Sequence, residues 1–178
     1  MHDPQDLIAI FQSCFLNTHN TVLVRGGDEP IYYPQTQDGK SAQIIFARGY
    51  FSSALHEIAH WLVAGDKRRM LEDYGYWYEP DGRDAQKQAL FQQVEIKPQA
   101  IEWILSKASG YRFRISNDNL SGESLDSEQF KDDIYQQVLS YKEKGLPERT
   151  LIFQEALSKF YKTESNFSST EFFRSELD

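Results

Sequence analysis

The amino-acid sequence predicts a single α+β domain that is mostly helical and carries a small antiparallel sheet. Its 178 residues, 40% hydrophobic and 14% aromatic, are enough to bury a substantial core. Three short β-rich runs follow one another between residues 21 and 49, with no helical pattern between the first and the last. Most of the remaining chain has apolar residues at helical spacing.

The first expected element is a helix that begins at Asp3 and Pro4, a capping residue followed by a first-turn proline, and runs to about Leu16. The runs TVLVRGG, EPIYYP and SAQIIFARG then predict three strands, each ended by glycine or proline. Because these strands are consecutive, we expect them to form an antiparallel sheet.

The middle of the chain is expected to be helical. A helix from about Ser53 to Ala64 has Ser52 as a candidate cap and Gly65 at its end. A short helix within residues 67–78 and a turn at residues 80–84 follow. Residues 85–107 are again helical, but Pro98 must kink this helix or start a new one.

The last third of the chain begins with a polar, glycine-bearing stretch at residues 109–128, which predicts a long loop. Helices at about residues 128–144 and 148–161 then complete a domain that spans residues 1–162. Residues 163–178 are polar and rich in serine, so we expect a mobile tail there.

The net charge of −8 argues against binding to nucleic acid or to an anionic membrane, and a basic partner would be better tolerated. Cys14 is the only cysteine, so no internal disulfide can form, which fits a reducing compartment. The N-terminal residues lack the features of a signal peptide or a transmembrane span. We therefore expect a cytoplasmic protein, and we expect it to be monomeric.

The run SSALHEIAHW contains the clearest chemical motif. His56 and His60 are four residues apart, so on a helix both imidazoles can point at one metal ion. Glu57 occupies the place of the residue that activates metal-bound water in helical metalloenzymes of this pattern. The motif therefore predicts a zincin-like metal helix. The alternative is a pair of partly buried histidines that hydrogen-bond to the backbone.

A third ligand is needed, and the sequence favours a carboxylate. His2 is terminal and His19 lies in a predicted loop, so both are expected to be exposed rather than to bind metal. Of the downstream candidates Asp84, Glu95 and Glu102, we prefer Glu95, because Val94 and Ile96 flank it and an unpaired carboxylate there would be costly. The structural alternative is a salt bridge from Glu95 to Lys97 or Arg83.

This ligand set is compatible with more than one function. Two histidines and a carboxylate hold zinc in peptidases, where Glu57 would be the general base, and they also hold Fe(II) in enzymes that use dioxygen. Residue identities do not separate the two. A purely structural zinc site is the third alternative, but such sites favour cysteine.

Three further segments offer weaker candidates. DKRR, at residues 66–69, is either a charge complement at a helix C-terminus or a docking site for an acidic partner. The aromatic run at residues 74–78 is either core or the wall of a cleft beside the metal. RGGDEP, which includes Asp28 and Glu29, is either a tight turn or an acidic lip over the site.

The blocks DEPIYYP, FARGYFSSALHEIAHW, YGYWYEPDGRDAQ, VEIKPQAIEW and GLPERTLIFQEAL, in this order, resemble the bacterial elongation factor P hydroxylase family. The resemblance runs from near the N-terminus to about Tyr161. It implies hydroxylation of the β-lysyl-modified lysine of elongation factor P. His56 and His60 match the family's metal histidines, Glu57 matches the motif glutamate, and Glu95 is our assignment for the carboxylate.

The resemblance further implies that Fe(II) is the metal and that dioxygen is the co-substrate. The modified lysine carries extra positive charge, so Glu57, Asp28 and Glu29 would form an acidic cleft for it. Tyr76, within the aromatic run, would contact the aliphatic part of the side chain.

Overall fold

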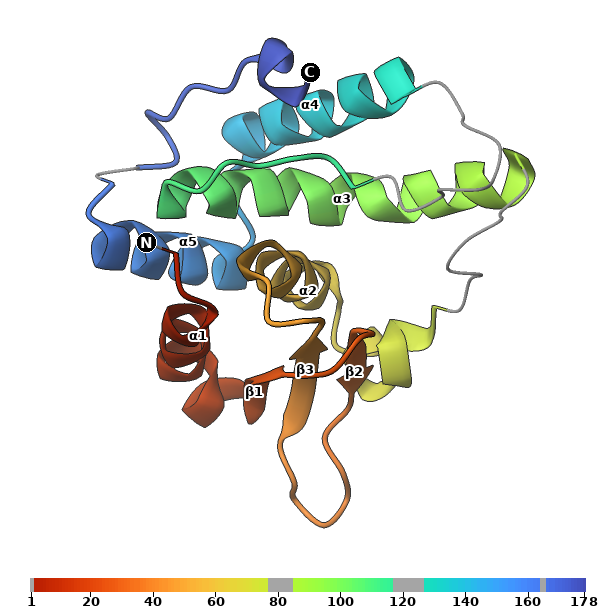
Figure 1. Cartoon of the computed structure of the whole chain (residues 1–178), viewed down its shortest axis with the longest axis vertical. Coiled ribbons are helices and arrows are strands. Elements are labelled where there is room, and N and C mark those ends of the chain that lie inside the picture. The colour runs from red at the N-terminus through yellow and green to blue at the C-terminus, as the bar shows by residue number, and fades with distance from the viewer. Residues whose placement is uncertain (1, 77–84, 117–126, 164–165) are drawn as a thin grey trace.

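The helix that carries the histidine motif, α2 (Phe51–Val63), lies between a three-stranded sheet and the long helix α3 (Ala85–Ser109) in the computed structural model (Figure 1). The structure describes residues 2–76, 85–116, 127–163 and 166–178. Its other elements are α1 (Pro4–His19), β1 (Thr21–Arg25), β2 (Ile31–Tyr33), β3 (Ala42–Phe46), the 3₁₀ helices η1 (Arg68–Met70) and η2 (Glu72–Gly75), α4 (Ser127–Lys144), α5 (Glu148–Tyr161) and the 3₁₀ helix η3 (Arg174–Leu177). The predicted class, a mostly helical α+β domain, is confirmed.

α1 begins as its sequence predicts. The Asp3 side chain accepts a hydrogen bond from the Gln5 backbone N–H, and Pro4 occupies the first turn. The helix extends to His19, three residues beyond its predicted end, and Asn20 then adopts a left-handed conformation that turns the chain into β1.

The sheet is mixed, so the prediction of an antiparallel sheet was wrong. The strand order is β1-β3-β2, in which β1 pairs in parallel with β3 and β2 pairs antiparallel with β3. The chain does reverse direction at each connection. However, β3 inserts between the first two strands and so lies beside β1, which runs in the same direction.

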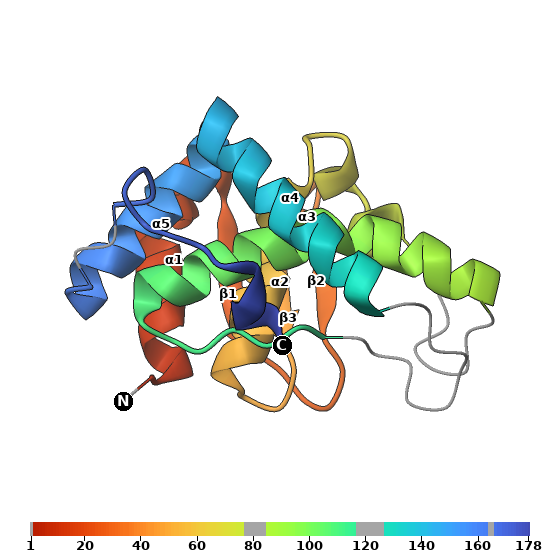
Figure 2. The ribbon, with the colours of Figure 1, turned by 90° about the horizontal axis from the view of Figure 1, so that it is seen from above.

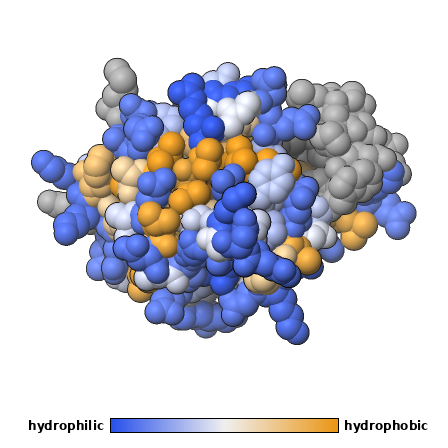
Figure 3. Space-filling model, turned by 90° about the horizontal axis from the view of Figure 1, so that it is seen from below, coloured by the Kyte–Doolittle hydropathy of each residue, from blue (hydrophilic) through white to orange (hydrophobic). Residues whose placement is uncertain are grey.

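One face of the sheet packs on the helices and the other is open. Leu23 and Ile44 point inward and are 1% exposed. On the opposite face, Val24, Ile31 and Ile45 are partly buried and pair across the strands. Figure 3 shows hydrophobic residues gathered in the middle of the side of the molecule seen from below.

α2 begins at Phe51, two residues earlier than predicted, and Ser52 does not cap it. The N-cap position is Tyr50, which provides no side-chain hydrogen bond. The neighbouring Ser53 accepts a hydrogen bond from the Ala47 N–H, so it satisfies the preceding turn instead of the helix end. α2 ends at Val63, one residue before its predicted end.

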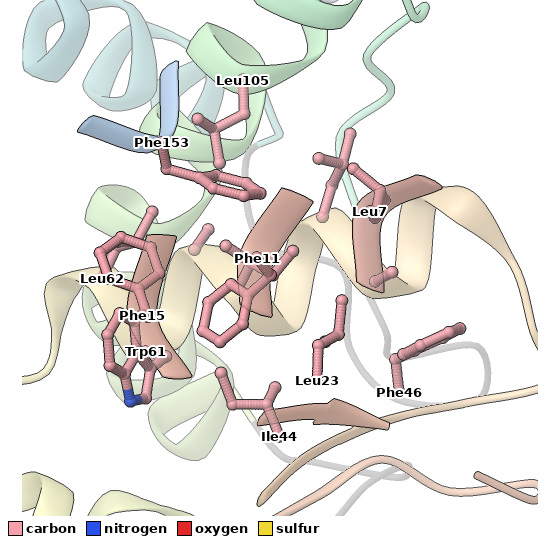
Figure 4. Close-up of a cluster of buried hydrophobic side chains, with 14 of the residues drawn as sticks. Leu7, Phe11, Phe15, Leu23, Ile44, Phe46, Trp61, Leu62, Leu105 and Phe153 are labelled. Atoms are coloured by element: carbon pink, nitrogen blue, oxygen red, sulfur yellow. The ribbon is translucent and has the colours of Figure 1, made fainter. Parts of the chain in front are cut away.

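Two clusters of buried hydrophobic side chains lie between the secondary-structure elements. The larger joins α1, the sheet, α2, α5 and part of α3, and Figure 4 shows Phe11, Phe15, Trp61 and Phe153 meeting at its centre. The second lies between α3, α4 and the C-terminal segment, and in Figure 2 α4 crosses over α3. α3 therefore contributes to both.

Pro98 lies inside α3, which the structure shows as one continuous helix, so no new helix begins there. A proline in this position lacks the N–H that would bond to the carbonyl of Val94, four residues earlier. Both residues line a pocket described below.

The C-terminal residues pack on the protein, which corrects the expectation of a free polar tail at residues 163–178. Phe167, Phe172 and Leu177 are each 7% exposed and belong to the second cluster. Arg174 also forms an ion pair with Glu128 of α4 at 2.7 Å. The segment is rich in serine, but it also contains apolar residues at intervals, and these are buried against α3 and α4.

The remaining predictions concern the middle and late segments. Two 3₁₀ helices, η1 and η2, stand where one short helix was expected, and α4 and α5 are confirmed. Residues 111–116 have no regular structure, as predicted for the start of the long loop. The predicted turn at residues 80–84, with Arg83 and Asp84, lies outside the described residues. No helix in the described parts of the chain is long and apolar enough to cross a membrane.

Candidate metal centre

The centre of the site lies between α2 and α3. The core-facing side of α2 buries Leu55, Ile58 and Leu62 against the sheet and α1, and this leaves His56 and His60 on another side of the helix. α3 packs against α2 and carries two buried glutamates, seven residues apart, on one face.

His56, His60 and Glu95 converge, as the sequence predicts. The Nε2 atoms of the two histidines are 3.1 Å apart. Glu95 Oε1 lies 3.1 Å from His60 Nε2, and Glu95 Oε2 lies 3.6 Å from His56 Nε2. One ligand atom from each residue falls within 4.8 Å of the others, so a single ion could contact all three.

The donor atoms suit a divalent cation. Glu95 is 1% exposed, and within the described structure its Oε2 has no hydrogen-bond partner. A buried carboxylate oxygen without a partner is costly, and a cation between it and the two Nε2 atoms would satisfy it. Two of the structural alternatives, a hydrogen bond from either histidine to the backbone and a salt bridge from Glu95 to Lys97, are not found among the described residues, and Arg83 lies outside them. The ion-pair partners of Glu95 are the two histidines.

Glu102 occupies a different position from the one considered for it in the sequence. Its Oε2 accepts a hydrogen bond from His56 Nδ1 at 2.8 Å, on the side of the ring that faces away from the convergence point. This contact keeps the proton on Nδ1 and leaves the Nε2 lone pair free to bind a metal. The seven-residue spacing from Glu95, two turns on one helix face, was the signal in the sequence for this pairing.

The charges of the cluster shift its pKa values. Burial raises the pKa of Glu95, but the nearby His60 and His56 and hydrogen bonds from His60 and Gln99 outweigh it and lower the pKa to about 2. Burial lowers the pKa of His56, yet the charge and hydrogen bond of Glu102 raise it well above its ordinary value. Burial also raises the pKa of Glu57 and Glu102. Three carboxyl groups thus lie around two imidazoles, a set of donor groups that suits a bound cation.

Glu57 lies beside the cluster. No hydrogen bond or ion pair joins its carboxylate to another residue in the described part of the chain. Its electrostatic neighbours are His56, His60, Glu95 and Asp73.

A pocket of about 430 Å³ opens next to His60. Its lining residues come from the end of α2, η1, η2 and α3, namely His60, Val63, Ala64, Gly65, Asp66, Lys67, Arg68, Tyr74, Tyr76, Val94 and Pro98. Tyr76 is therefore in the pocket wall, with the Arg68 guanidinium 4.1 Å from its ring centroid. Trp77 and Tyr78 lie outside the described residues.

Asp28 and Glu29 are not among the residues that line this pocket. Both are exposed in the connection between β1 and β2, and Asp28 forms an ion pair with Arg48 at 3.7 Å. The acidic lip expected from the sequence is therefore not part of the pocket wall.

Neither of the other histidines belongs to the cluster, but the expectation that they are exposed was wrong. His2 is partly buried, and its Nε2 lies 2.8 Å from the Ser109 carbonyl oxygen. Three aromatic rings surround it, from Phe51, Tyr111 and Tyr161. His19 is partly buried at the end of α1, which extends further than predicted.

Two arginines hold the C-terminal end of α2, close to His60. Arg69, from the DKRR segment, donates to the Ala64 carbonyl at 2.8 Å, which agrees with a charge complement at the helix end. Arg149 of α5 donates to the carbonyls of Trp61 and Ala64 at 3.0 and 2.8 Å. Sequence reasoning missed Arg149, because no local pattern connects it to α2.

Comparison with known proteins agrees with the resemblance described above. The sequence profile of a family described as elongation factor P hydroxylase matches residues 10–172. A relative from Haemophilus influenzae, named elongation factor P lysine hydroxylase, is 54% identical over 171 residues, which is 96% of each chain. The matched region includes all the residues of the cluster.

We expect His56→Ala and Glu95→Gln each to lower the affinity for a divalent metal by roughly 100-fold, because each removes one of three donors. Titration of the metal-free protein with Co(II), followed by its visible absorption, measures this. Glu155→Gln, at an exposed position of α5, is the matched control and should bind as the unmodified protein does. Full affinity in either site variant would contradict the ligand assignment.

Metal binding should release a proton. The nearby Glu102 raises the pKa of His56 well above its ordinary value, so the metal-free protein favours the protonated ring, which must lose a proton when Nε2 binds a cation. Affinity should therefore rise by about tenfold per pH unit until the pH passes that pKa. By the same shift, His56 stabilises the metal-free fold below the ordinary histidine pKa, and this contribution is lost as the pH rises through the raised pKa. Calorimetry with Zn(II) in two buffers of different ionisation enthalpy measures the proton release, and no release at neutral pH would disprove the expectation.

Removal of the Glu102 carboxylate should weaken metal binding without removing a ligand. Glu102→Ala is expected to lower Co(II) affinity by 10- to 100-fold, roughly the effect of losing an outer hydrogen bond to a ligating histidine. Glu102→Gln keeps a neutral acceptor for Nδ1–H, so its loss should be smaller. Equal losses in the two variants would show that the hydrogen bond to His56 is not what matters.

Proposed function

The chain belongs to the elongation factor P hydroxylase family, and from this membership we propose that it hydroxylates the β-lysyl-modified lysine of elongation factor P in a metal-dependent reaction. The relative from Haemophilus influenzae is named as a lysine hydroxylase of this factor. One structural observation carries the metal dependence, namely the meeting of two imidazole Nε2 atoms with a buried carboxylate oxygen that has no hydrogen-bond partner within the described residues.

Fe(II) is the metal we propose, held by His56, His60 and Glu95. Two histidines and a carboxylate leave coordination positions open, and Fe(II) in such a set supplies the activation of dioxygen needed to hydroxylate an unactivated C–H bond. The task of the three side chains is to hold the ion in one place, and that of the surrounding core is to keep bulk water away from it.

Glu57 is proposed to hold the positive end of the modified lysine. The cluster contains three carboxyl groups, from Glu57, Glu95 and Glu102, so a divalent cation does not neutralise all three when they are ionised. Glu57 is the member of the three without an ion-pair partner among the described residues. A substrate ammonium beside it would be favourable, because the site is shielded from water and electrostatic attraction is strong there.

The pocket next to His60 is proposed to receive the side chain. Val63, Val94 and Pro98 offer apolar contacts to its methylene groups, and the Tyr76 ring stands in the wall. Asp28 and Glu29, which do not line the pocket, would contact a basic part of the partner outside it.

A zinc peptidase, in which Glu57 activates water, uses the same ligands. Family membership does not favour this alternative. The two functions differ in the role they give to Glu57 and in their need for dioxygen.

The protein loaded with Fe(II) and supplied with a two-electron reductant such as ascorbate should add one oxygen atom to β-lysyl-modified elongation factor P in air, with the second atom of dioxygen reduced to water, and should add none under argon. Mass spectrometry of the factor measures this addition, with unmodified factor as the substrate control. His56→Ala should abolish the reaction. Equal conversion by His56→Ala and the unmodified enzyme, or conversion without dioxygen, would refute the proposal.

Glu57→Gln separates the hydroxylase from the peptidase. As a substrate-binding residue, Glu57 should be replaceable with full metal content and a KM for the modified factor roughly tenfold higher, since one charge interaction is lost. If Glu57 were instead the general base of a peptidase, Glu57→Gln would lower the kcat of peptide hydrolysis by about 10²- to 10⁴-fold.

A further inference from the structure

The two histidines of the cluster are held in different ways. Glu102 fixes the His56 ring through a hydrogen bond to Nδ1. Among the described residues, the polar contacts of His60 are made by its Nε2, with Nε2 of His56 and with Oε1 of Glu95, each at 3.1 Å, and none is made by its Nδ1. His60 also borders the pocket, so it lacks close packing on one side.

Tyr74 supplies a flat surface next to His60. The two rings are nearly parallel, with 12° between their planes and 6.4 Å between their centroids. The Tyr74 ring also stacks on the ring of Tyr32 of β2, with 4.3 Å between the ring centroids and 14° between the ring planes. Tyr74 is 5% exposed, so its ring has little freedom to move away from His60.

The backbone that holds Tyr74 is strained. Asp73, Tyr74 and Gly75 have φ angles of 44°, 60° and 74°. These three successive residues thus lie in the left-handed region, which glycine adopts far more readily than other residues. Each such non-glycine residue is held in this conformation at an energetic cost. A run of this kind persists only when its surroundings fix it.

Several hydrogen bonds do fix this turn. Asp73 Oδ1 accepts from the Tyr32 N–H at 2.8 Å, which joins the turn to the edge of the sheet. The Tyr74 carbonyl accepts from Arg68 Nη1 at 2.9 Å, and the Tyr74 N–H donates to Leu71 O at 3.1 Å. The turn is therefore clamped to the sheet on one side and to η1 on the other.

The hydroxyl group of Tyr74 does not explain its position, because this oxygen is buried without a hydrogen-bond partner among the described residues. The ring is what contacts both neighbours. Simple core packing would account for a buried ring, but it would not require a strained turn that sets the ring parallel to a histidine of the metal cluster.

We propose that Tyr74 is the positioning residue for His60: the clamped left-handed turn at residues 73–75 holds its ring as a rigid surface that keeps the His60 imidazole aimed at the convergence point. This rests on the metal centre of the proposed function. The ring does for His60, by contact, what Glu102 does for His56 by a hydrogen bond.

Two substitutions separate the ring from the hydroxyl. Tyr74→Leu removes the flat surface and is expected to lower Co(II) affinity by about tenfold and to alter the visible spectrum of the Co(II) complex. Tyr74→Phe keeps the ring and should bind Co(II) within twofold of the unmodified protein, with an unchanged spectrum. In the metal-free protein, NMR relaxation of selectively labelled His60 should show an ordered ring in the unmodified and Phe forms and a mobile ring in the Leu form.

Phe113→Leu is the matched control, because it removes a 6%-exposed ring from the second cluster, away from His60. It should lower the melting temperature without changing the Co(II) spectrum. If Tyr74→Leu does not fold, Gly75→Ala tests the turn instead. Gly75 has a φ of 74°, so an alanine there is strained, and its Cβ would also lie 2.8 Å from Cδ1 of the exposed Leu71 side chain. This strain is expected to loosen the turn while the Tyr74 ring is kept, and Co(II) binding should weaken.

Unchanged Co(II) affinity and an ordered His60 in Tyr74→Leu, or unchanged affinity in Gly75→Ala, would overturn the proposal. So would a loss of affinity in Tyr74→Phe equal to that in Tyr74→Leu, because the hydroxyl would then be the active group. Failure of the proposed function is a separate result: the unmodified protein would leave modified elongation factor P unchanged, while the order of the His60 ring in the metal-free protein would still decide the role of Tyr74.

Discussion

The burial of the Glu95 carboxylate opposite two imidazoles is the constraint on which the site and its surroundings depend. An ionised carboxylate that is 1% exposed must face positive charge or lose much of its hydration energy. The groups that face it are the Nε2 atoms of His60 and His56, at 3.1 and 3.6 Å. These rings belong to α2 and the carboxylate to α3. The ion pairs therefore fix the position along α3 at which it meets α2. Glu102, two turns later on the same face of α3, accepts a hydrogen bond from His56. This second contact also fixes the position of α3 along α2.

α2 can meet this requirement only if it is itself held firmly. Its core-facing side packs on the sheet and α1, and its C-terminal carbonyls receive hydrogen bonds from Arg69 and Arg149. Burial, followed by the nearby charge of Arg69, lowers the pKa of Arg149 to about 10, which still leaves it charged at neutral pH. A guanidinium at the carbonyl end of a helix is favourable both as a donor and through the helix dipole. The last turn of α2, which contains His60, is thus fixed by residues that come from η1 and from α5.

Local features of the fold could be predicted from the sequence, and features that depend on distant neighbours could not. The Asp3 cap and the bounds of α5 follow from signals within a few residues, and so does the pairing of His56 with His60 on one helix face. The order of the strands was missed because nothing local tells β3 to enter between β1 and β2. The packing of residues 166–178 was missed for a related reason. The composition of this segment is polar on average, and the burial of Phe172 depends on α3 and α4, which are distant in the sequence. At the site, the preference for Glu95 came from its apolar neighbours, whereas the contribution of Arg149 required the folded chain.

The role of each buried glutamate follows from which ring nitrogen it meets. Glu95 and Glu102 have the same chemistry and nearly the same burial, so residue type and exposure do not tell them apart. A ligand must reach the point shared by both Nε2 atoms, and Glu102, which contacts Nδ1 of His56, is on the wrong side of that ring. Its hydrogen bond is to His56, and this makes that ring the stronger donor. His60 has no such partner among the described residues and borders the 430 Å³ pocket instead. The two histidines therefore differ in their surroundings, because His56 meets the charge of Glu102 on α3 and His60 meets the ring of Tyr74 beside the pocket.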